Sequence, residues 1–117
     1  MLTIPDIRQR ASHDCGIACI VAAARSLGIR VSYDLYSDLA DPVCGMEPDT
    51  VAAALRSLGV NALCGRLPLG VEDLRHYTRG GCPVLCPITC EGAGHWVIVR
   101  GVARALVYAH DPSQRGP

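Results

Sequence analysis

The chain has 117 residues, of which half are apolar, and its 11 basic and 11 acidic side chains cancel. This length corresponds to about one domain, and the apolar half is sufficient to bury a core. A disordered tail or a basic nucleic-acid module needs excess charge or too few apolar residues, and this chain has neither. Every basic residue is arginine, and these arginines are scattered among acids, so no nucleic-acid partner is expected.

The cysteine count and the N-terminus indicate the compartment. Seven cysteines cannot all pair within one chain, so at least one thiol is free or bonded to another chain. Residues 1–8 lack the basic and apolar regions of a secretory signal, and no stretch reaches the roughly 18 to 20 apolar residues of a membrane span. We therefore expect a soluble, cytoplasmic segment that does not itself insert into a membrane.

A central buried helix is predicted over residues 16–27. The segment is rich in strong helix formers, is apolar nearly all round, and is followed by Gly28 at a suitable stop position. Asp14 is a candidate N-cap, which places Cys15 in the first turn of the helix.

Two shorter helices are predicted next. One covers residues 33–39, and the other covers 51–58, with Asp49 or Thr50 as its cap and Gly59 as its stop.

The second half changes to a strand pattern. The expected elements are a strand over 61–67, a helix over 71–77 and strands over 82–90, 95–102 and 105–110. The 95–102 segment is β-branched and alternating, and a turn at 103–104 folds it back onto the last strand. Helices followed by an antiparallel meander predict an α+β fold, in a single domain over residues 1–117.

Three residues have the chemistry of a thiol hydrolase. Cys15 lies at a helix N-terminus, where the helix dipole and unpaired N–H groups favour a thiolate. His95 begins a strand after a glycine-rich loop, and Asp111 follows the next strand, so the hairpin brings Asp111 or His110 beside His95. A nucleophile, a base and an orienting carboxylate are the groups that nucleophilic catalysis requires. Gln9 adds a carboxamide that could serve with the Cys15 N–H as an oxyanion hole.

Other uses of these residue types remain open. Cys82, Cys86 and Cys90 suggest a metal site with His95, but a four-residue spacing on a strand separates neighbours by about 13 Å, so no metal or other cofactor is expected. A Cys15–Cys19 disulfide is disfavoured by helix geometry.

Two histidines compete with His95. His13 is a rival base because it is close to Cys15 in sequence, although a residue across a helix start usually points elsewhere. His110 precedes Asp111 and so faces the other side of its strand.

Four segments carry a family resemblance when they are taken together and in order. Gln9, residues 14–19 (DCGIAC), residues 94–99 (GHWVIV) and residues 111–112 (DP) resemble the bacteriocin-processing peptidase family. Members are papain-like cysteine peptidases that cut double-glycine leader peptides, and they are commonly the N-terminal cytosolic domain of ABC transporters. The resemblance implies a papain-like fold, with N-terminal helices packed on a C-terminal antiparallel sheet.

The resemblance also implies roles and partners. Cys15 is then the nucleophile, His95 the general base and acid, Asp111 the orienting carboxylate and Gln9 the oxyanion donor. The substrate is a precursor peptide, and transporter membrane and ATPase domains are possible partners in the same or another chain. A double-glycine preference implies a narrow tunnel, for which Trp96 and Tyr77 are candidate walls.

Two other functions are considered beside cleavage. One is a docking domain that binds leaders without turnover, and the other is a papain-like deamidase or transglutaminase. The chain ends soon after Asp111, so we also expect that the domain is truncated or unusually short.

Overall fold

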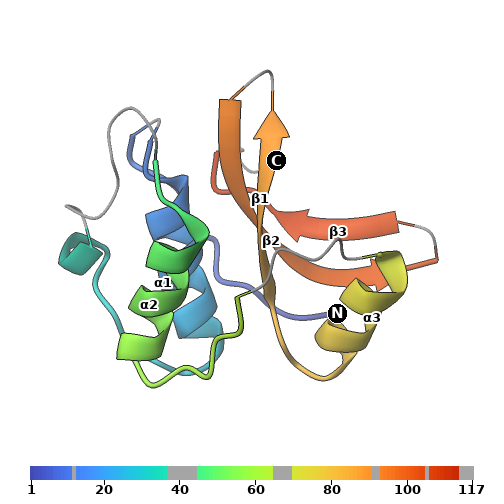
Figure 1. The fold of residues 1–117 in the computed structure, drawn as a ribbon. Helices are drawn as coiled ribbons and strands as arrows, with labels where there is room; N and C mark the ends of the chain where they lie inside the picture. The colour runs from blue at the N-terminus through green and yellow to red at the C-terminus, as the bar shows by residue number, and fades with distance from the viewer. Residues whose placement is uncertain (12, 37–44, 65–69, 91–92, 105, 114–117) are drawn as a thin grey trace.

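The computed structural model describes residues 1–11, 13–36, 45–64, 70–90, 93–104 and 106–113. The elements in chain order are α1 (Cys15–Ser26), the 3-10 helix η1 (Tyr33–Tyr36), α2 (Pro48–Ser57), α3 (Val71–Arg79), β1 (Val84–Cys90), β2 (Ala93–Ala103) and β3 (Leu106–His110). Helices precede an antiparallel sheet, which confirms the α+β class. Figure 1 shows α1 and α2 side by side on one side of the molecule, with the sheet and α3 on the other.

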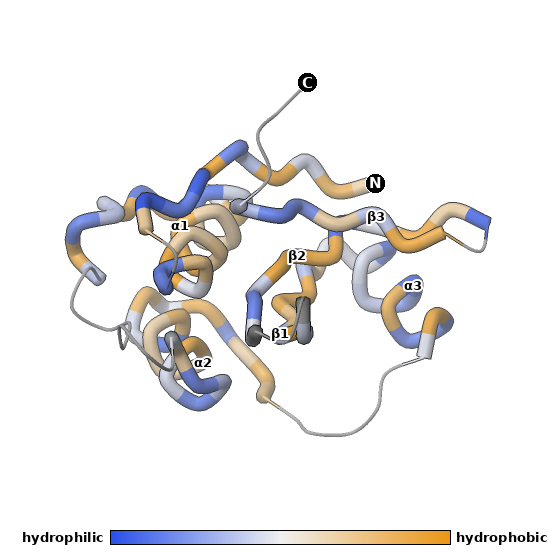
Figure 2. The backbone as a smooth tube through the Cα atoms, turned by 90° about the horizontal axis from the view of Figure 1, so that it is seen from above, coloured by the Kyte–Doolittle hydropathy of each residue, from blue (hydrophilic) through white to orange (hydrophobic). Residues whose placement is uncertain are grey.

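Helix α1 is the centre of the core. All residues from Cys15 to Ala24 are buried, as expected for a helix that is apolar on every face (Figure 2). The chain leaves the helix at Gly28, whose φ of 83° lies in the left-handed region that favours glycine, and its N–H donates to the Arg25 carbonyl. The predicted helix is confirmed within one residue at each end, and Cys15 lies in its first turn.

Of the other two N-terminal helices, one differs from prediction at its start and the other in its type. Helix α2 begins at Pro48, earlier than the expected caps, because proline suits the first position of a helix. Its stop at Gly59 is as predicted, with a φ of 85°. The expected helix over 33–39 is the short η1, and residues 37–39 lie outside the described residues. Within the described parts of the chain, no helix has both the length and the apolarity to cross a bilayer.

The predicted strand over 61–67 is wrong where it can be checked. Residues 61–64 are not in a strand, and 65–67 lie outside the described residues. The Arg56 side chain donates instead to the Ala62 carbonyl at 2.9 Å, and Leu63 is 85% exposed. The segment therefore follows the end of α2 instead of pairing with the sheet.

The sheet has the order β1-β2-β3, with β2 in the middle. Strand β1 pairs along its whole length with the first part of β2, from Val84 opposite Val99 to Cys90 opposite Ala93. The β2–β3 pairing is shorter and starts at Ile98 opposite His110. Helices α1 and α3 both pack against β2, so this strand joins the two sides of the molecule.

The N-terminal segment runs beside the β2–β3 hairpin before it enters α1. The N–H of Leu2 donates to the Arg100 carbonyl at 2.9 Å, and the Ile7 carbonyl lies 3.1 Å from Nε2 of His110. Because of these contacts, residues 8–11 enter the region where β3 ends and α1 begins.

Shortening Ile20 to alanine is expected to lower the free energy of unfolding by about 3 kcal/mol. Ile20 is fully buried in the middle of α1, so the variant loses apolar burial and leaves a cavity. Urea unfolding measures the change. Leu35→Ala is the matched control: Leu35 is 67% exposed, and its loss should change stability by less than about 0.5 kcal/mol. Equal losses for both variants would contradict this view of the core.

Candidate active site

Cys15 lies at the first position of α1 and is 6% exposed. The first backbone bond of the helix runs from the Ala18 N–H to the Asp14 carbonyl at 3.1 Å. The N–H groups of Cys15 and the next two residues therefore have no partner within the helix. These unpaired N–H groups and the positive end of the helix dipole lie at the helix start, where Cys15 is.

The sulfur of Cys15 contacts the middle strand of the sheet. The backbone N–H of Trp96 donates to Cys15 Sγ at 3.4 Å. The β2–β3 pairing begins only at Ile98, so Trp96 lies in a part of β2 that β3 does not reach. The start of α1 therefore docks at this part of β2. The backbone N–H that the thiol contacts belongs to the residue that directly follows His95 in the sequence.

His95 and Asp111 form a close pair. Nε2 of His95 lies 2.6 Å from Oδ1 of Asp111. The hairpin brings the two together, although in a different register from the one expected: His110 lies opposite Ile98, and Asp111 reaches His95 from just beyond the end of β3. Both side chains are largely enclosed, with 12% and 23% of their surfaces exposed.

The pair determines which ring nitrogen of His95 is available as a base. A carboxylate only accepts hydrogen bonds, so the Nε2 that faces Asp111 carries the proton. In the neutral ring the other nitrogen, Nδ1, then has the free lone pair. Among the described residues, the histidine paired with Asp111 is His95 and not the rival base His13.

Ser113 completes the surroundings of Asp111 and was not found from the sequence. Its N–H and its hydroxyl both donate to Asp111 Oδ1, at 2.9 and 2.6 Å. Burial acts to raise the pKa of Asp111, but the hydrogen bonds from Ser113 and His95 hold it below its ordinary value. The available signal was the Asp-Pro-Ser order, because an aspartate commonly accepts hydrogen bonds from the residue two positions on.

Gln9 is held against the same region by two hydrogen bonds. Its backbone N–H donates to the Pro112 carbonyl at 3.1 Å, and its amide Nε2 donates to the Ala11 carbonyl at 2.9 Å. The second amide hydrogen remains available as a donor. The structure therefore places the Gln9 backbone beside the segment that carries Asp111, and the Gln9 amide is bonded to Ala11.

The comparison with known families identifies the family of the chain. The model of the peptidase C39 family matches residues 3–117. The chain belongs to the peptidase C39 family. No curated protein and no solved structure gave a significant match. C39 peptidases are papain-like cysteine peptidases, which agrees with the helices packed on an antiparallel sheet.

The two candidate walls of the C39 site have different surroundings. Trp96 is buried, and its indole N–H donates to the Met46 carbonyl at 3.0 Å. A side chain at Gly16 would meet Met46 and Trp96 at 3.0 and 3.3 Å, so both residues pack directly beside the start of α1. Tyr77 lies on α3, which both Figure 1 and Figure 2 place at the far end of the sheet from α1. Trp96 is therefore the better placed of the two.

The remaining cysteines do not form a second centre in the described part of this C39 chain. Cys19 and Cys86 are free thiols, and burial raises the pKa of both. Cys82 is exposed, and the side chain of Cys90 lies outside the described residues. No group of three or more potential ligands gathers among the described residues.

Replacing Ser113 by alanine is expected to raise the pKa of Asp111, because the carboxylate loses a donor. A carboxylate whose pKa is lowered by folding stabilises the folded state above its unfolded pKa, about 3.9, and loses that effect as the pH falls through the folded value. The stability difference between parent and variant should therefore be full at pH 7 and shrink below about pH 4. Urea unfolding at several pH values measures it.

Ser57→Ala is the control for this experiment. The Ser57 hydroxyl donates to the Ala54 carbonyl, which does not titrate, so the cost of its loss should not depend on pH in this way. A pH-independent cost for the Ser113 variant would contradict the expected coupling to Asp111.

Proposed function

We propose that the chain is a cysteine endopeptidase that removes the leader from a secreted peptide precursor, cutting after a double-glycine-type motif. Membership of the C39 family supports a cysteine peptidase. The observation that carries the proposal is the arrangement of three groups: Cys15 Sγ lies against the backbone of Trp96, and the adjacent His95 is paired with Asp111.

The reaction begins with proton transfer from the Cys15 thiol to Nδ1 of His95. The thiolate attacks the peptide carbonyl carbon, and a carbon–sulfur bond forms as the carbonyl becomes an oxyanion. The imidazolium then protonates the leaving amine, and the carbon–nitrogen bond breaks to leave an acyl-enzyme. A water molecule activated by His95 hydrolyses the thioester, which releases the leader acid and restores the thiol.

Two donors stabilise the oxyanion in this proposal. One is the Cys15 N–H, which has no partner within α1, and the other is the free amide hydrogen of Gln9. Asp111 keeps the proton of His95 on Nε2 and stabilises the imidazolium by its negative charge.

The proposed setting is the cytoplasmic side of an export system. The precursor peptide is the substrate, and transporter membrane and ATPase domains, in the same or another chain, are the proposed partners.

Mass spectrometry of a double-glycine precursor peptide incubated with the protein tests the proposal. Two fragments that result from a cut after the double glycine are the expected result. A gain of about one dalton or incorporation of an added amine would indicate a side-chain acyl transferase instead. Binding without any change in mass would indicate a docking domain, and either of these last two outcomes would overturn the proposal.

A further inference from the structure

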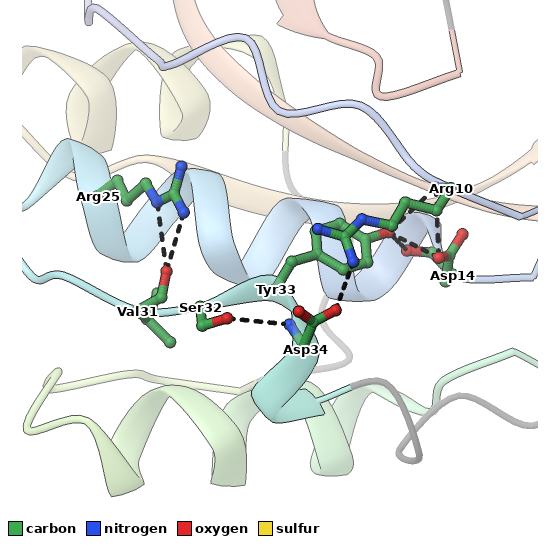
Figure 3. A network of polar contacts seen from close by, with 7 residues as sticks. All are labelled: Arg10, Asp14, Arg25, Val31, Ser32, Tyr33 and Asp34. Atoms are coloured by element: carbon green, nitrogen blue, oxygen red, sulfur yellow. Dashed lines mark hydrogen bonds and ion pairs between the residues drawn. The ribbon is translucent and has the colours of Figure 1, made fainter.

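Asp14 is a buried carboxylate that lies immediately before Cys15. It occupies the N-cap position of α1, as expected, but its side chain makes no capping bond to the helix. Oδ1 instead accepts the Ala11 N–H at 2.8 Å, and Oδ2 accepts the Arg10 N–H at 3.3 Å and the Tyr33 hydroxyl at 2.7 Å. Figure 3 shows the carboxylate turned back toward Arg10 and Tyr33. Its hydrogen bonds therefore order the segment before the helix.

The hydroxyl of Tyr33 stays protonated and so continues to donate to Asp14. Burial and the bond to Asp14 hold the pKa of Tyr33 well above its ordinary value, so its hydroxyl remains a donor. The guanidinium of Arg10 stacks over the Tyr33 ring, 4.2 Å from its centroid, and pairs with Asp34. The ion pair is exposed, so it contributes little to holding the segment. The buried carboxylate is the stronger attachment.

The segment ordered by Asp14 holds the amide of Gln9. The Ala11 N–H is bonded to Asp14, and the Ala11 carbonyl accepts the Gln9 amide at 2.9 Å. Asp14 is also covalently joined to Cys15, whose N–H is the other oxyanion donor in the proposed reaction. Asp14 thus links Cys15, the proposed nucleophile, to Ala11, whose carbonyl sets the direction of the Gln9 amide.

We propose that Asp14 is a positioning residue for the Gln9 amide, acting through the backbone of Ala11. This inference rests on the peptide cleavage proposed above. Asp14 does not touch the substrate in this proposal. Asp14 instead fixes the distance between the two oxyanion donors, the Cys15 N–H and the Gln9 amide. Such donors are effective only when they are preorganised around the developing charge.

Peptide cleavage and thiol alkylation together separate this role from a general structural one. Cleavage passes through an oxyanion, whereas alkylation of Cys15 by iodoacetamide requires only the thiolate. For Asp14→Ala we expect kcat on a leader peptide ending in a Gly-Gly fluorogenic amide to fall about 10- to 100-fold. KM and the alkylation rate of Cys15 should change less than about twofold, because binding and the thiolate are not altered.

A double variant tests the route through Gln9. Gln9→Ala should lower kcat about 100-fold, and adding Asp14→Ala should cost little more, because the amide it positions is already absent. If the two losses multiply, Asp14 acts elsewhere and the inference is overturned. An equal fall in kcat and alkylation rate for Asp14→Ala would overturn it as well.

Two further variants complete the design. Arg10→Ala is the matched control, since it removes a neighbouring side chain but leaves its backbone bond to Asp14, and it should retain parental kcat. A loss equal to that of Asp14→Ala would overturn the inference. If Asp14→Ala does not fold, Tyr33→Phe removes one donor to the carboxylate and should lower kcat a few-fold with alkylation unchanged; parental kcat in that variant would overturn the inference.

The outcomes also separate this inference from the proposed function. If the parent protein cuts the peptide, and Gln9→Ala lowers kcat but Asp14→Ala does not, the proposed function stands. Only the positioning role of Asp14 is then contradicted. A parent that leaves the peptide intact contradicts the proposed function itself.

Discussion

Replacing Cys15 with alanine is expected to abolish cleavage of a double-glycine precursor, with a fall in rate of about 10⁴-fold or more. The substitution removes one sulfur atom and leaves the start of α1 buried, so the fold and the binding of the peptide should be retained. Cleavage followed by mass spectrometry, together with a binding measurement on the same variant, separates loss of chemistry from loss of structure.

Cys64→Ser is the matched control for this variant. Cys64 is an exposed free thiol that donates to the Asp49 carboxylate. Its replacement should leave the cleavage rate unchanged. A Cys15→Ala variant that cuts the peptide as well as the parent would falsify the assignment of the nucleophile.

The elements that were predicted well are those whose signals are local. Helix α1 combines strong helix formers, an apolar surface all round and a glycine stop, and these signals agree with its burial. The β2–β3 hairpin has a clear alternation and a short turn, at which Arg104 takes a φ of 57°. The expected strand over 61–67 failed, because a short apolar run forms a strand only when a partner strand is available.

The pairing of His95 with Asp111 was expected from the sequence, but its register was not. A hairpin that begins near His95 and ends before Asp111 brings the two residues to the same end of the strand pair. The irregular pairing between Val99 and Gly101 then shifts the register, and it cannot be read from the sequence. The contact between Cys15 and Trp96 joins residues 81 positions apart, so only the packed fold reveals it.

Asp14 shows why local patterns misjudge a side chain. Aspartate before a helix usually caps it, since the nearest unpaired donors are the N–H groups of the first turn. In this chain Tyr33, 19 residues later, supplies a hydroxyl to the carboxylate, and the N–H groups of the preceding segment supply the rest. The Asp14 side chain therefore leaves the N–H groups of the first turn of α1 without a capping bond. In the proposed reaction, negative charge develops at this position.

The geometry of the sheet explains why Cys15 contacts the backbone of Trp96 and why the neighbouring His95 pairs with Asp111. Strand β3 stops pairing at Ile98, which leaves the earlier part of β2 available to the start of α1. Asp111 follows the end of β3, so it lies beyond the paired residues, where its carboxylate contacts His95. The early end of the β2–β3 pairing thus leaves room for both the start of α1 and the Asp111 carboxylate. The short β2–β3 pairing is therefore the feature on which the arrangement depends.

Replacing His95 with alanine is expected to lower kcat by about 10³-fold or more, because the variant loses both the base and the acid of the proposed reaction. The alkylation rate of Cys15 at neutral pH should fall too, since no imidazolium stabilises the thiolate. The rival base gives the sharpest comparison. His13→Ala should cut the peptide at the parental rate, because it leaves the His95–Asp111 pair intact. If His13→Ala were inactive and His95→Ala active, the carboxylate-paired histidine would not be the base, and the contact with Asp111 would be structural only.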